Sequence, residues 1–453
     1  MHKVFHSFRR RIQLVQNGLS LRRKSLDALL GDLFHDVQLH RVFPDSITFI
    51  DMVPPKRLNH ILKEYKERRY DPDFDLVAFV NTHFVPAKQK SVYVTNKKHS
   101  VEEHIQDLWK VLRRTQYRDK GSLIGLPHPY IVAGGRFQSA FYWDSYFIML
   151  GLAAGGRWKM VKNMTNNFAF LIRKYGCIPN GSRTYFISRS QPPFFAMMVR
   201  LLAEHEGEQT LVEYLPYLLA EHRFWMKGRA SLKQGRSSAQ RVVRMPGGEI
   251  LNRYFDNKST PRPEGYYEDL STVLQNRTNP SKQYVNLRAA AESGWDFSSR
   301  WFADGKNLAT IRTIDLVPVD LNCLLVLLEQ TIAKAYTILR QKRAAAHYQA
   351  LAKDRQEAIN TYCWNEKKGF YFDYDLSAKK FSSSETLAAV FPLWAGIASQ
   401  QQAQKVAKWL EERFLRKGGL VCTLVETGQQ WDAPNGWPPL QWVAIRGLRE
   451  YSL

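Results

Sequence analysis

The chain has 453 residues, of which 44% are hydrophobic, and it carries 65 Lys and Arg against 42 Asp and Glu, a formal net charge of +23. A chain of this length and apolar content can bury one large core or two ordinary ones, which excludes a wholly disordered protein. Aromatic residues make up 13% of the chain, with 12 Trp, and rings that line sugar subsites are one use for such a surplus.

The cysteines and the N-terminal region predict a reduced, cytoplasmic protein. Cys177, Cys323, Cys363 and Cys422 lie far apart and match neither a CxxC motif nor a Cys/His metal spacing, so no disulfide framework or zinc site is expected. No apolar run is long enough to span a membrane, and no signal-peptide core is present. The basic runs at 9–11 and 22–24 are expected to form a solvated or frayed helix, with a targeting or anion-binding role as the alternative. A monomer is expected.

In chain order, residues 1–90 are predicted to form an N-terminal helical extension that packs on a larger body, because apolar residues around Leu26, Leu30 and Phe34 have helical spacing. From about Val101 the pattern becomes a series of amphipathic helices, so residues 91–453 are predicted to form a second domain. Its helices are expected at 101–115, 141–154, 160–175, 194–204, 209–226, 317–340, 343–363, 385–397 and 401–416.

Convincing strands are scarce, so the predicted fold class is all-α. Helices that alternate with loops rich in Gly, Pro and aromatic residues fit a toroid of paired helices whose site lies where the loops gather. The same periodicity also fits an open α-solenoid. Residues 227–260 contain many Lys and Arg residues and break the helical rhythm, and they are predicted to form an exposed loop across the site.

The first candidate site segment joins a Gly-Gly turn to the start of a predicted helix. Gly134 and Gly135 let the backbone approach a ligand beside Arg136, and Trp143 and Asp144 follow at the helix start. A carboxylate near a helix N-terminus can stay ionised and accept hydrogen bonds from hydroxyls, although it can equally be an ordinary helix-start residue. The glycines do not form a phosphate loop, since neither GxGxxG nor a GK[ST] ending is present.

Two further loops set arginines beside amides or carboxylates between stiffening prolines. One contains Asn180 and then Arg189, and the other contains Arg262 and Glu264. Taken together, the loop arginines and Glu264 are predicted to form a polar cup for sugar hydroxyls. Taken singly, each is more typical of a structural loop pair.

Asp296 lies between Trp295 and Phe297, and this apolar setting favours its protonated form, which suits a general acid. The alternative is a helix N-cap before Ser298 and Ser299. The run 428–439, GQQWDAPNGWPP, combines indole rings, amides and a carboxylate in a turn and is predicted to be one wall of a sugar site. Its alternative is a buried turn stabilised by Trp packing.

These segments, in order and spacing, resemble the signatures of the α,α-trehalase family of glycoside hydrolases, in its signal-less, cytoplasmic bacterial form. The resemblance runs from about residue 36 to the last residue. It implies a glucoamylase-like (α/α)6 toroid, a six-hairpin barrel, and inverting hydrolysis of trehalose to two glucoses in trehalose catabolism, without a metal or cofactor. The motifs that carry it are FPDSITFIDMVP, DFDLVAFVNTHFVP, AGGRFQSAFYWDSYF, IPNGSRTYFISRSQPPFF, PRPEGYYED, AAESGWDFSSRW, VPVDLN and TGQQWDAPNGWPPLQW.

The resemblance also implies the roles of individual residues. Asp296 is implied to be the general acid, which protonates the bridging oxygen while a second carboxylate activates a water on the opposite face of the ring. Sugar-binding roles are implied for Arg136, Trp143, Asp144, Asn180, Arg189, Ser190, Gln191, Arg262, Glu264 and Gly294.

The family's general base is a Glu in a GGGGEY loop downstream of the QWDAPNGW segment, and residues 1–453 contain no such loop. We therefore expect a C-terminally truncated chain with incomplete closure of the toroid and weak or absent activity. One alternative is a catalytically inactive remnant that binds trehalose or another sugar. Another is a basic module that binds nucleic acid, but no stripe of Lys and Arg with stacking aromatics stands out. The resemblance implies a small-molecule substrate, trehalose, as the partner.

Overall fold

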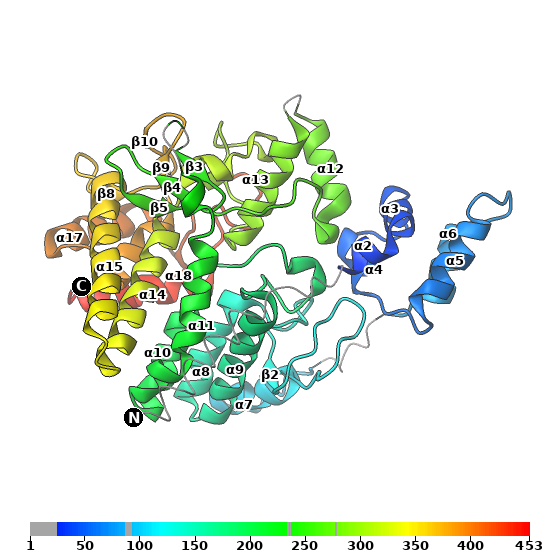
Figure 1. Cartoon of the computed structure of the whole chain (residues 1–453), viewed down its shortest axis with the longest axis horizontal. Helices are drawn as coiled ribbons and strands as arrows, with labels where there is room; N and C mark the ends of the chain where they lie inside the picture. Colours follow the sequence, from blue (N-terminus) through cyan, green and yellow to red (C-terminus); the bar gives the residue numbers. More distant parts are fainter. Residues whose placement is uncertain (1–24, 87–92, 233–234, 236, 277–278) are drawn as a thin grey trace.

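The computed structural model describes residues 25–86, 93–232, 235, 237–276 and 279–453, and helices dominate it (Figure 1). The basic arm expected at 9–11 and 22–24 lies outside these residues. None of the described helices is long and apolar enough to cross a membrane. All four cysteines are buried and free.

The N-terminal region consists of short helices with a core of their own. Asp45 and Asp75 cap two of these helices by accepting hydrogen bonds from backbone amides in the first turn. The apolar faces share one cluster that also takes in Tyr185 and Phe186 from the main body. Figure 1 shows these helices beside α12 at the edge of the body. They are α2 (Leu26–Leu30), α3 (Asp32–Leu39), α4 (Ser46–Asp51), α5 (Leu58–Arg68) and α6 (Leu76–His83).

The first half of the main body is a run of helix pairs. Ser100 and Glu103 form a capping box at the start of α7, and Gly176 ends α9 in the left-handed conformation. Helix α8 packs against α9 and α10, and α10 packs against α11. The helices are α7 (Val101–Leu112), α8 (Tyr142–Ala154), α9 (Trp158–Tyr175), α10 (Phe195–Glu206) and α11 (Gln209–Trp225).

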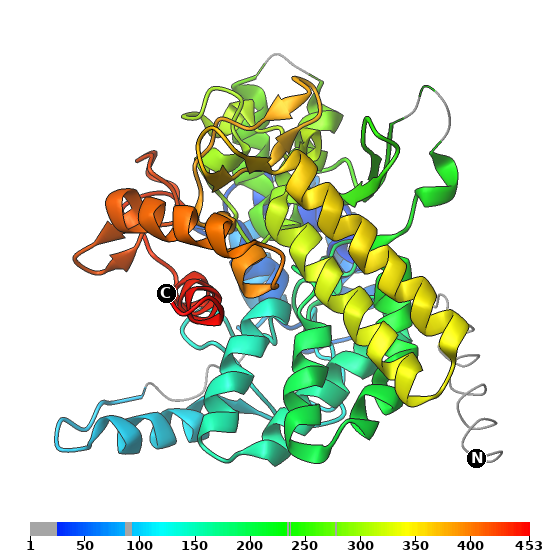
Figure 2. The same ribbon diagram turned by 90° about the vertical axis from the view of Figure 1, so that its left-hand side faces the viewer.

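The second half continues the same pattern. Helix α14 packs against α10, α15 and α16, and α16 packs against α18, so the successive packing turns round a common interior. Figure 2 shows α15 lying along α14, with α18 viewed nearly end-on. One large apolar cluster runs from α8 to α18. The helices are α12 (Tyr266–Leu274), α13 (Pro280–Glu292), α14 (Val319–Ile338), α15 (Lys342–Tyr362), α16 (Phe391–Trp394), α17 (Gln400–Trp409) and α18 (Pro438–Glu450).

These pairings confirm the predicted all-α toroid rather than a solenoid, and the strands are short and lie in the connections. Every pairing is antiparallel. The sheets are β1 (Arg113–Arg114) with β2 (Tyr130–Ile131); β3 (Ser238–Ala239), β4 (Val242–Arg244) and β5 (Ile250–Asn252); β6 (Leu316–Val317), β9 (Tyr374–Asp375) and β10 (Lys380–Phe381); β7 (Trp364–Asn365) with β8 (Phe370–Tyr371); and β11 (Leu415–Arg416) with β12 (Gly419–Leu420).

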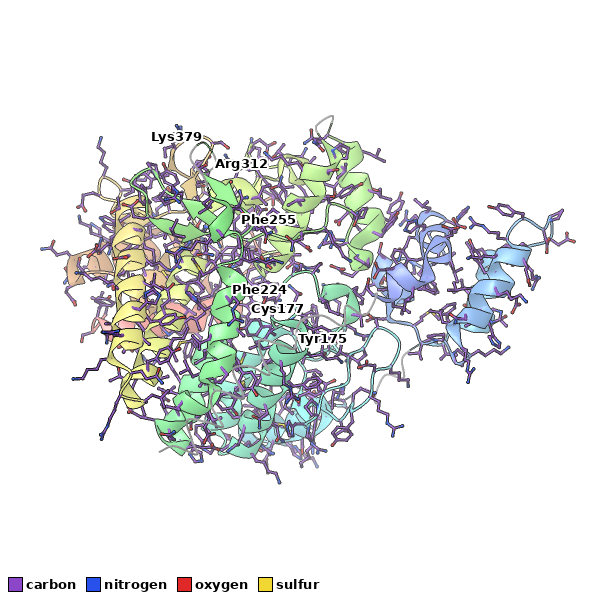
Figure 3. The ribbon with its side chains drawn as sticks, viewed as in Figure 1. Tyr175, Cys177, Phe224, Phe255, Arg312 and Lys379 are labelled. Atoms are coloured by element: carbon purple, nitrogen blue, oxygen red, sulfur yellow. The ribbon has the colours of Figure 1, made fainter. Side chains whose placement is uncertain are left out.

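The prediction of an exposed loop at 227–260 is wrong for its central part. Strands β3, β4 and β5 form a small sheet there, and Val242 and Val243 are fully buried. Arg241 is buried as well, because Glu292 neutralises it and Phe224 stacks on it with 4.0 Å from the guanidinium carbon to the ring centroid. Figure 3 labels Phe224 inside the body near the top of α11.

Helices α12, α13 and α18 were also not predicted.

Candidate active site

The predicted site residues lie on loops and helix ends of the main body. Trp143 and Asp144 occupy the first turn of α8. Arg262 and Glu264 belong to the entrance of α12, where a short 3-10 helix, η3 (Pro263–Gly265), precedes it. Asp296 follows the end of α13 and precedes a second 3-10 helix, η4 (Ser299–Trp301). Neither Arg262 nor Glu264 is therefore held by a long helix, and other contacts must fix them.

Arg189, Arg262 and Glu264 form a buried charged cluster. The Arg189 guanidinium donates to Glu264. Asp269, one turn into α12, holds Arg262 through Nε at 3.0 Å and Nη2 at 2.7 Å, and it also accepts from the Arg262 backbone amide at 2.8 Å. The Arg262 guanidinium carbon lies 4.8 Å from the centroid of the Phe297 ring, which places this cation beside the residue that follows Asp296.

Several polar atoms of this cluster have no protein partner. Nε and Nη1 of Arg189 and Oε2 of Glu264 are buried without a hydrogen bond. Burial acts to raise the pKa of Glu264, but Arg189 and Arg262 outweigh it and the pKa is lowered, so this carboxylate is ionised. A buried unpaired donor or acceptor costs about 1–3 kcal/mol, so this cluster is suited to take the hydroxyls of a polar ligand.

Asp296 has the electrostatic setting expected of a general acid. Burial raises its pKa from 3.8 to about 6, with a smaller contribution from Glu264 and opposing contributions from Arg262 and Arg189. The alternative of a helix N-cap does not hold, because Ser298 caps η4 by accepting from the Arg300 amide. The Asp296 side chain is therefore free of a capping role.

The activity against trehalose is expected to show an alkaline limb set by Asp296. A general acid acts in its protonated form, so raising the folded-state pKa to about 6 extends activity to higher pH, and kcat/KM should fall by about tenfold per pH unit above that value. Measurement of kcat/KM between about pH 4 and pH 8 checks this. A limb near the ordinary pKa of 3.8 would contradict the assignment.

Asp144 lies in the first turn of α8, as predicted, but it is not simply held ionised there. Burial, with a smaller contribution from the charge of Asp296, raises its pKa to about 6 against the effect of a hydrogen bond to its own backbone. The charge of Asp296 thus acts on the Asp144 carboxyl group. At neutral pH Asp144 is mainly ionised and can accept hydrogen bonds from hydroxyls.

Indole rings from the segments that carry these carboxyl groups pack against one another. Trp431 is the centre of the group, with its ring centroid 5.3 Å from that of Trp295, 5.7 Å from Trp143 and 4.8 Å from Trp437. Gly294 lies against the Trp143 indole and has φ +76°, so a Cβ there would come within 3.0 Å of the ring. The aromatic wall predicted from the run at 428–439 therefore extends to the segment that carries Asp296.

Gly294→Ala is expected to lower both the melting temperature and the affinity for trehalose. The substitution forces a left-handed backbone on alanine, which costs about 1–2 kcal/mol, and it also pushes on the Trp143 ring. Gly305→Ala is the matched control, since Gly305 has φ +69° but nothing within 4 Å of its Cβ position. An equal loss of stability in both variants and an unchanged KM would show that the Trp143 contact contributes nothing.

Asn180, Ser190 and Gln191 use their side chains to hold the protein together. Asn180 Nδ2 donates to the carbonyls of Ser190, at 3.1 Å, and of Ala291, at 2.9 Å. Ser190 Oγ donates to a nearby carbonyl, and Gln191 Oε1 accepts from the Trp143 amide at 3.1 Å. These bonds join three of the site's segments, and a sugar-binding role for these residues stays a prediction.

Arg136 is the one predicted site residue that is exposed in the structure. It is exposed on the turn after Gly134 and Gly135, both of which have positive φ. Its guanidinium lies over the ring of Phe137 at 5.0 Å and makes no hydrogen bond or ion pair with the described residues. Arg136 can therefore contact a sugar only when a bound sugar reaches this exposed turn.

The comparison with known proteins gives the family. The trehalase family model matches residues 41–453. The chain belongs to the trehalase family. It is 50% identical over 429 residues to periplasmic trehalases from Salmonella dublin and Salmonella typhimurium, covering 94% of this chain and 75% of each relative. It is also similar to the neutral trehalase Nth1 from Saccharomyces cerevisiae, with a TM-score of 0.60 and 27% identity over 72% of this chain and 64% of that chain.

Membership of the trehalase family makes the chain a glycosidase by descent, but the predicted cytoplasmic location is wrong. The similar bacterial proteins are named periplasmic trehalases, and they match 94% of this chain. The prediction depended on the spacing of the cysteines and on the lack of an apolar span or signal-peptide core in the given sequence.

Three acidic residues that support the candidate site were not singled out from the sequence as supports. Asp269 holds Arg262, and Glu292 and Asp432 are both fully buried carboxylates with several hydrogen bonds each. Asp432 was predicted only as the carboxylate of the sugar-site wall at 428–439. A single acidic residue inside an apolar run could have predicted such a support, because a buried acid must find a partner. Glu292 follows Ala289, Ala290 and Ala291 and fits this pattern.

Proposed function

We propose that this chain hydrolyses trehalose to two glucoses with inversion, and that Asp296 is the general acid. The observation that carries the proposal is a carboxyl group whose pKa burial raises to about 6 against the opposing charges of Arg262 and Arg189, with a smaller contribution from Glu264. The 50% identity to proteins named periplasmic trehalase supports trehalose as the substrate, and it also supports the periplasm as the place of action.

In this proposal each group has a defined part. Protonated Asp296 donates to the bridging oxygen as the glycosidic bond breaks, and the charge that develops on the sugar ring is stabilised by the ionised carboxylates nearby. The unpartnered atoms of Arg189 and Glu264 take sugar hydroxyls. The indole rings of Trp143 and Trp431 offer flat apolar surfaces for the C–H faces of the sugar.

The general base is not evident among the described residues. Asp432 is fully buried and accepts hydrogen bonds from hydroxyls and a backbone amide, so it has no oxygen free for a water. Glu264 is paired with Arg189, which makes it a weak base. We therefore propose that a polypeptide of residues 1–453 turns over trehalose about 10²- to 10⁴-fold more slowly than one that also carries the family's GGGGEY segment.

Glucose release from trehalose tests the proposal, with the 453-residue polypeptide beside a version extended by a family-like GGGGEY segment. Fast release by the extended version and slow release by the shorter one is the expected result. Equal, fast release by both would show that a carboxylate within residues 1–453 serves as the base. Saturable trehalose binding by calorimetry without glucose from either version would replace the proposal with that of an inactive sugar-binding protein.

A further inference from the structure

The segment that carries Asp296 is bound along its length to residues 430–432. Gln430 donates its side-chain amide to the Asp296 carbonyl. The Trp431 backbone amide donates to the Phe297 carbonyl at 3.1 Å. Asp432 accepts from Ser298 Oγ at 2.9 Å and from the Ser299 amide at 2.9 Å. Successive residues on one segment thus hold successive residues on the other.

Of these three residues, Asp432 accepts the largest number of hydrogen bonds. Its side chain is 0% exposed and also accepts from Ser299 Oγ at 2.7 Å, from Thr423 Oγ1 at 2.9 Å and from Thr427. No Lys, Arg or His forms an ion pair with it among the residues that the structure describes. Burial of a carboxylate without a counter-ion carries a large desolvation cost. The hydrogen bonds from hydroxyls and an amide offset this cost, which indicates a specific structural role for Asp432.

The residues on either side of this segment are fixed by other means. Before Asp296, the Trp295 carbonyl accepts from Trp301 Nε1 at 3.0 Å. After Ser299, Arg300 is fully buried between Asp320 and Asp373, with bonds of 2.8 Å to each. Residues 297–299 lie between these two anchors, and within the described residues Asp432 is the side chain that binds both Ser298 and Ser299.

We propose that Asp432 is a positioning residue: it holds the backbone at 297–299 so that the Asp296 carboxyl group stays in place to protonate the bridging oxygen. This inference rests on the proposed function of Asp296. Asp432 acts through hydrogen bonds to Ser298 and Ser299 and does not touch the substrate. A displacement of about 1 Å in a proton donor is enough to cost on the order of 10²-fold in rate.

A comparison of two substrates with different leaving groups distinguishes this positioning role from general damage to the pocket. Trehalose needs a proton on its bridging oxygen, whereas the fluoride of α-D-glucosyl fluoride departs without one. Asp432→Asn, in the polypeptide that hydrolyses trehalose, should lower kcat for trehalose by about 10- to 100-fold with KM changed by less than about threefold. The turnover of glucosyl fluoride should stay within about threefold of the parent.

Two further variants control for folding. Ser299→Ala removes one bond to Asp432 and keeps the backbone amide, so it should give a smaller loss of the same kind. Glu426→Gln removes an exposed carboxylate from the same loop and should change neither substrate. Equal losses on trehalose and glucosyl fluoride in Asp432→Asn, or no loss on either, would overturn the proposal.

Hydrogen exchange on the 453-residue polypeptide tests the attachment without any need for turnover. In Asp432→Asn, the amides at 297–301 should exchange faster, while those of α8 and α14 keep their protection. Unchanged exchange at 297–301 would refute the inference even if trehalose hydrolysis is confirmed. Absence of hydrolysis in the parent protein, with faster exchange in the variant, would instead refute the proposed function and leave the attachment of the segment established.

Discussion

Asp296→Asn is expected to lower kcat for trehalose by about 10²- to 10⁴-fold. Asparagine has nearly the same size and cannot release a proton to the bridging oxygen. Burial raises the pKa of the native carboxyl to about 6, so a large fraction of Asp296 is protonated in mildly acidic conditions, and the variant loses that proton donor entirely. Steady-state rates of glucose release give the ratio, and calorimetric titration gives the affinity for trehalose.

The affinity of Asp296→Asn for trehalose should stay close to that of the parent, since Arg189, Arg262 and Glu264 are untouched. Its turnover of α-D-glucosyl fluoride should also persist, because fluoride leaves without protonation. Asp354→Asn, an exposed carboxylate on α15, is the matched control and should match the parent on both substrates. Full trehalose activity in Asp296→Asn would mean that another group is the acid.

Glu292→Gln is expected to lower the free energy of unfolding by about 3–5 kcal/mol. Glu292 and Arg241 are both fully buried, with Arg241 Nη2 at 2.5 Å from Glu292 Oε1. The variant leaves the Arg241 charge buried without a counter-ion. The carboxylate also accepts from the Ser190 amide at 2.9 Å and from the Phe255 amide at 2.8 Å, so it joins two loops to the end of α13.

Urea denaturation measures the effect of Glu292→Gln, and an exposed ion pair supplies the control. Glu357 lies 3.7 Å from Lys353 on the surface of α15, and Glu357→Gln should change the free energy of unfolding by less than about 0.5 kcal/mol. Similar small changes in both variants would show that Arg241 finds another partner when Glu292 is neutralised. A parallel rise in KM for Glu292→Gln would reflect movement of the loop at Ser190.

The helices of the toroid could be predicted from sequence where apolar residues recur at helical spacing over a long run. This holds for α8, α9, α11, α14 and α15, whose bounds lie within a few residues of the predicted ones. Helix α18 was missed because its sequence begins with two prolines, which suit the first helical turn but were taken as part of a loop. The proposed division of the chain at residue 90 stays a prediction.

The buried arginines could not be predicted from charge alone. Arg241 was assigned to an exposed loop because neighbouring residues are basic, yet its burial depends on Glu292, which is distant in sequence. The residues of the predicted sugar site come together through similar long-range contacts, as in Arg189 with Glu264. The order of the motifs along the chain indicated which segments form the predicted sugar site. Only the fold shows which polar atoms in that site remain without hydrogen-bond partners.

The most direct test of the account is proton NMR of glucose as it is released from trehalose. Inverting hydrolysis keeps the α configuration in the glucose that leaves and gives the β configuration at the attacked carbon, so the first products should be α- and β-glucose in equal amounts. Initial release of α-glucose alone would contradict inversion. No glucose from a polypeptide extended by the GGGGEY segment would contradict trehalose hydrolysis by this site.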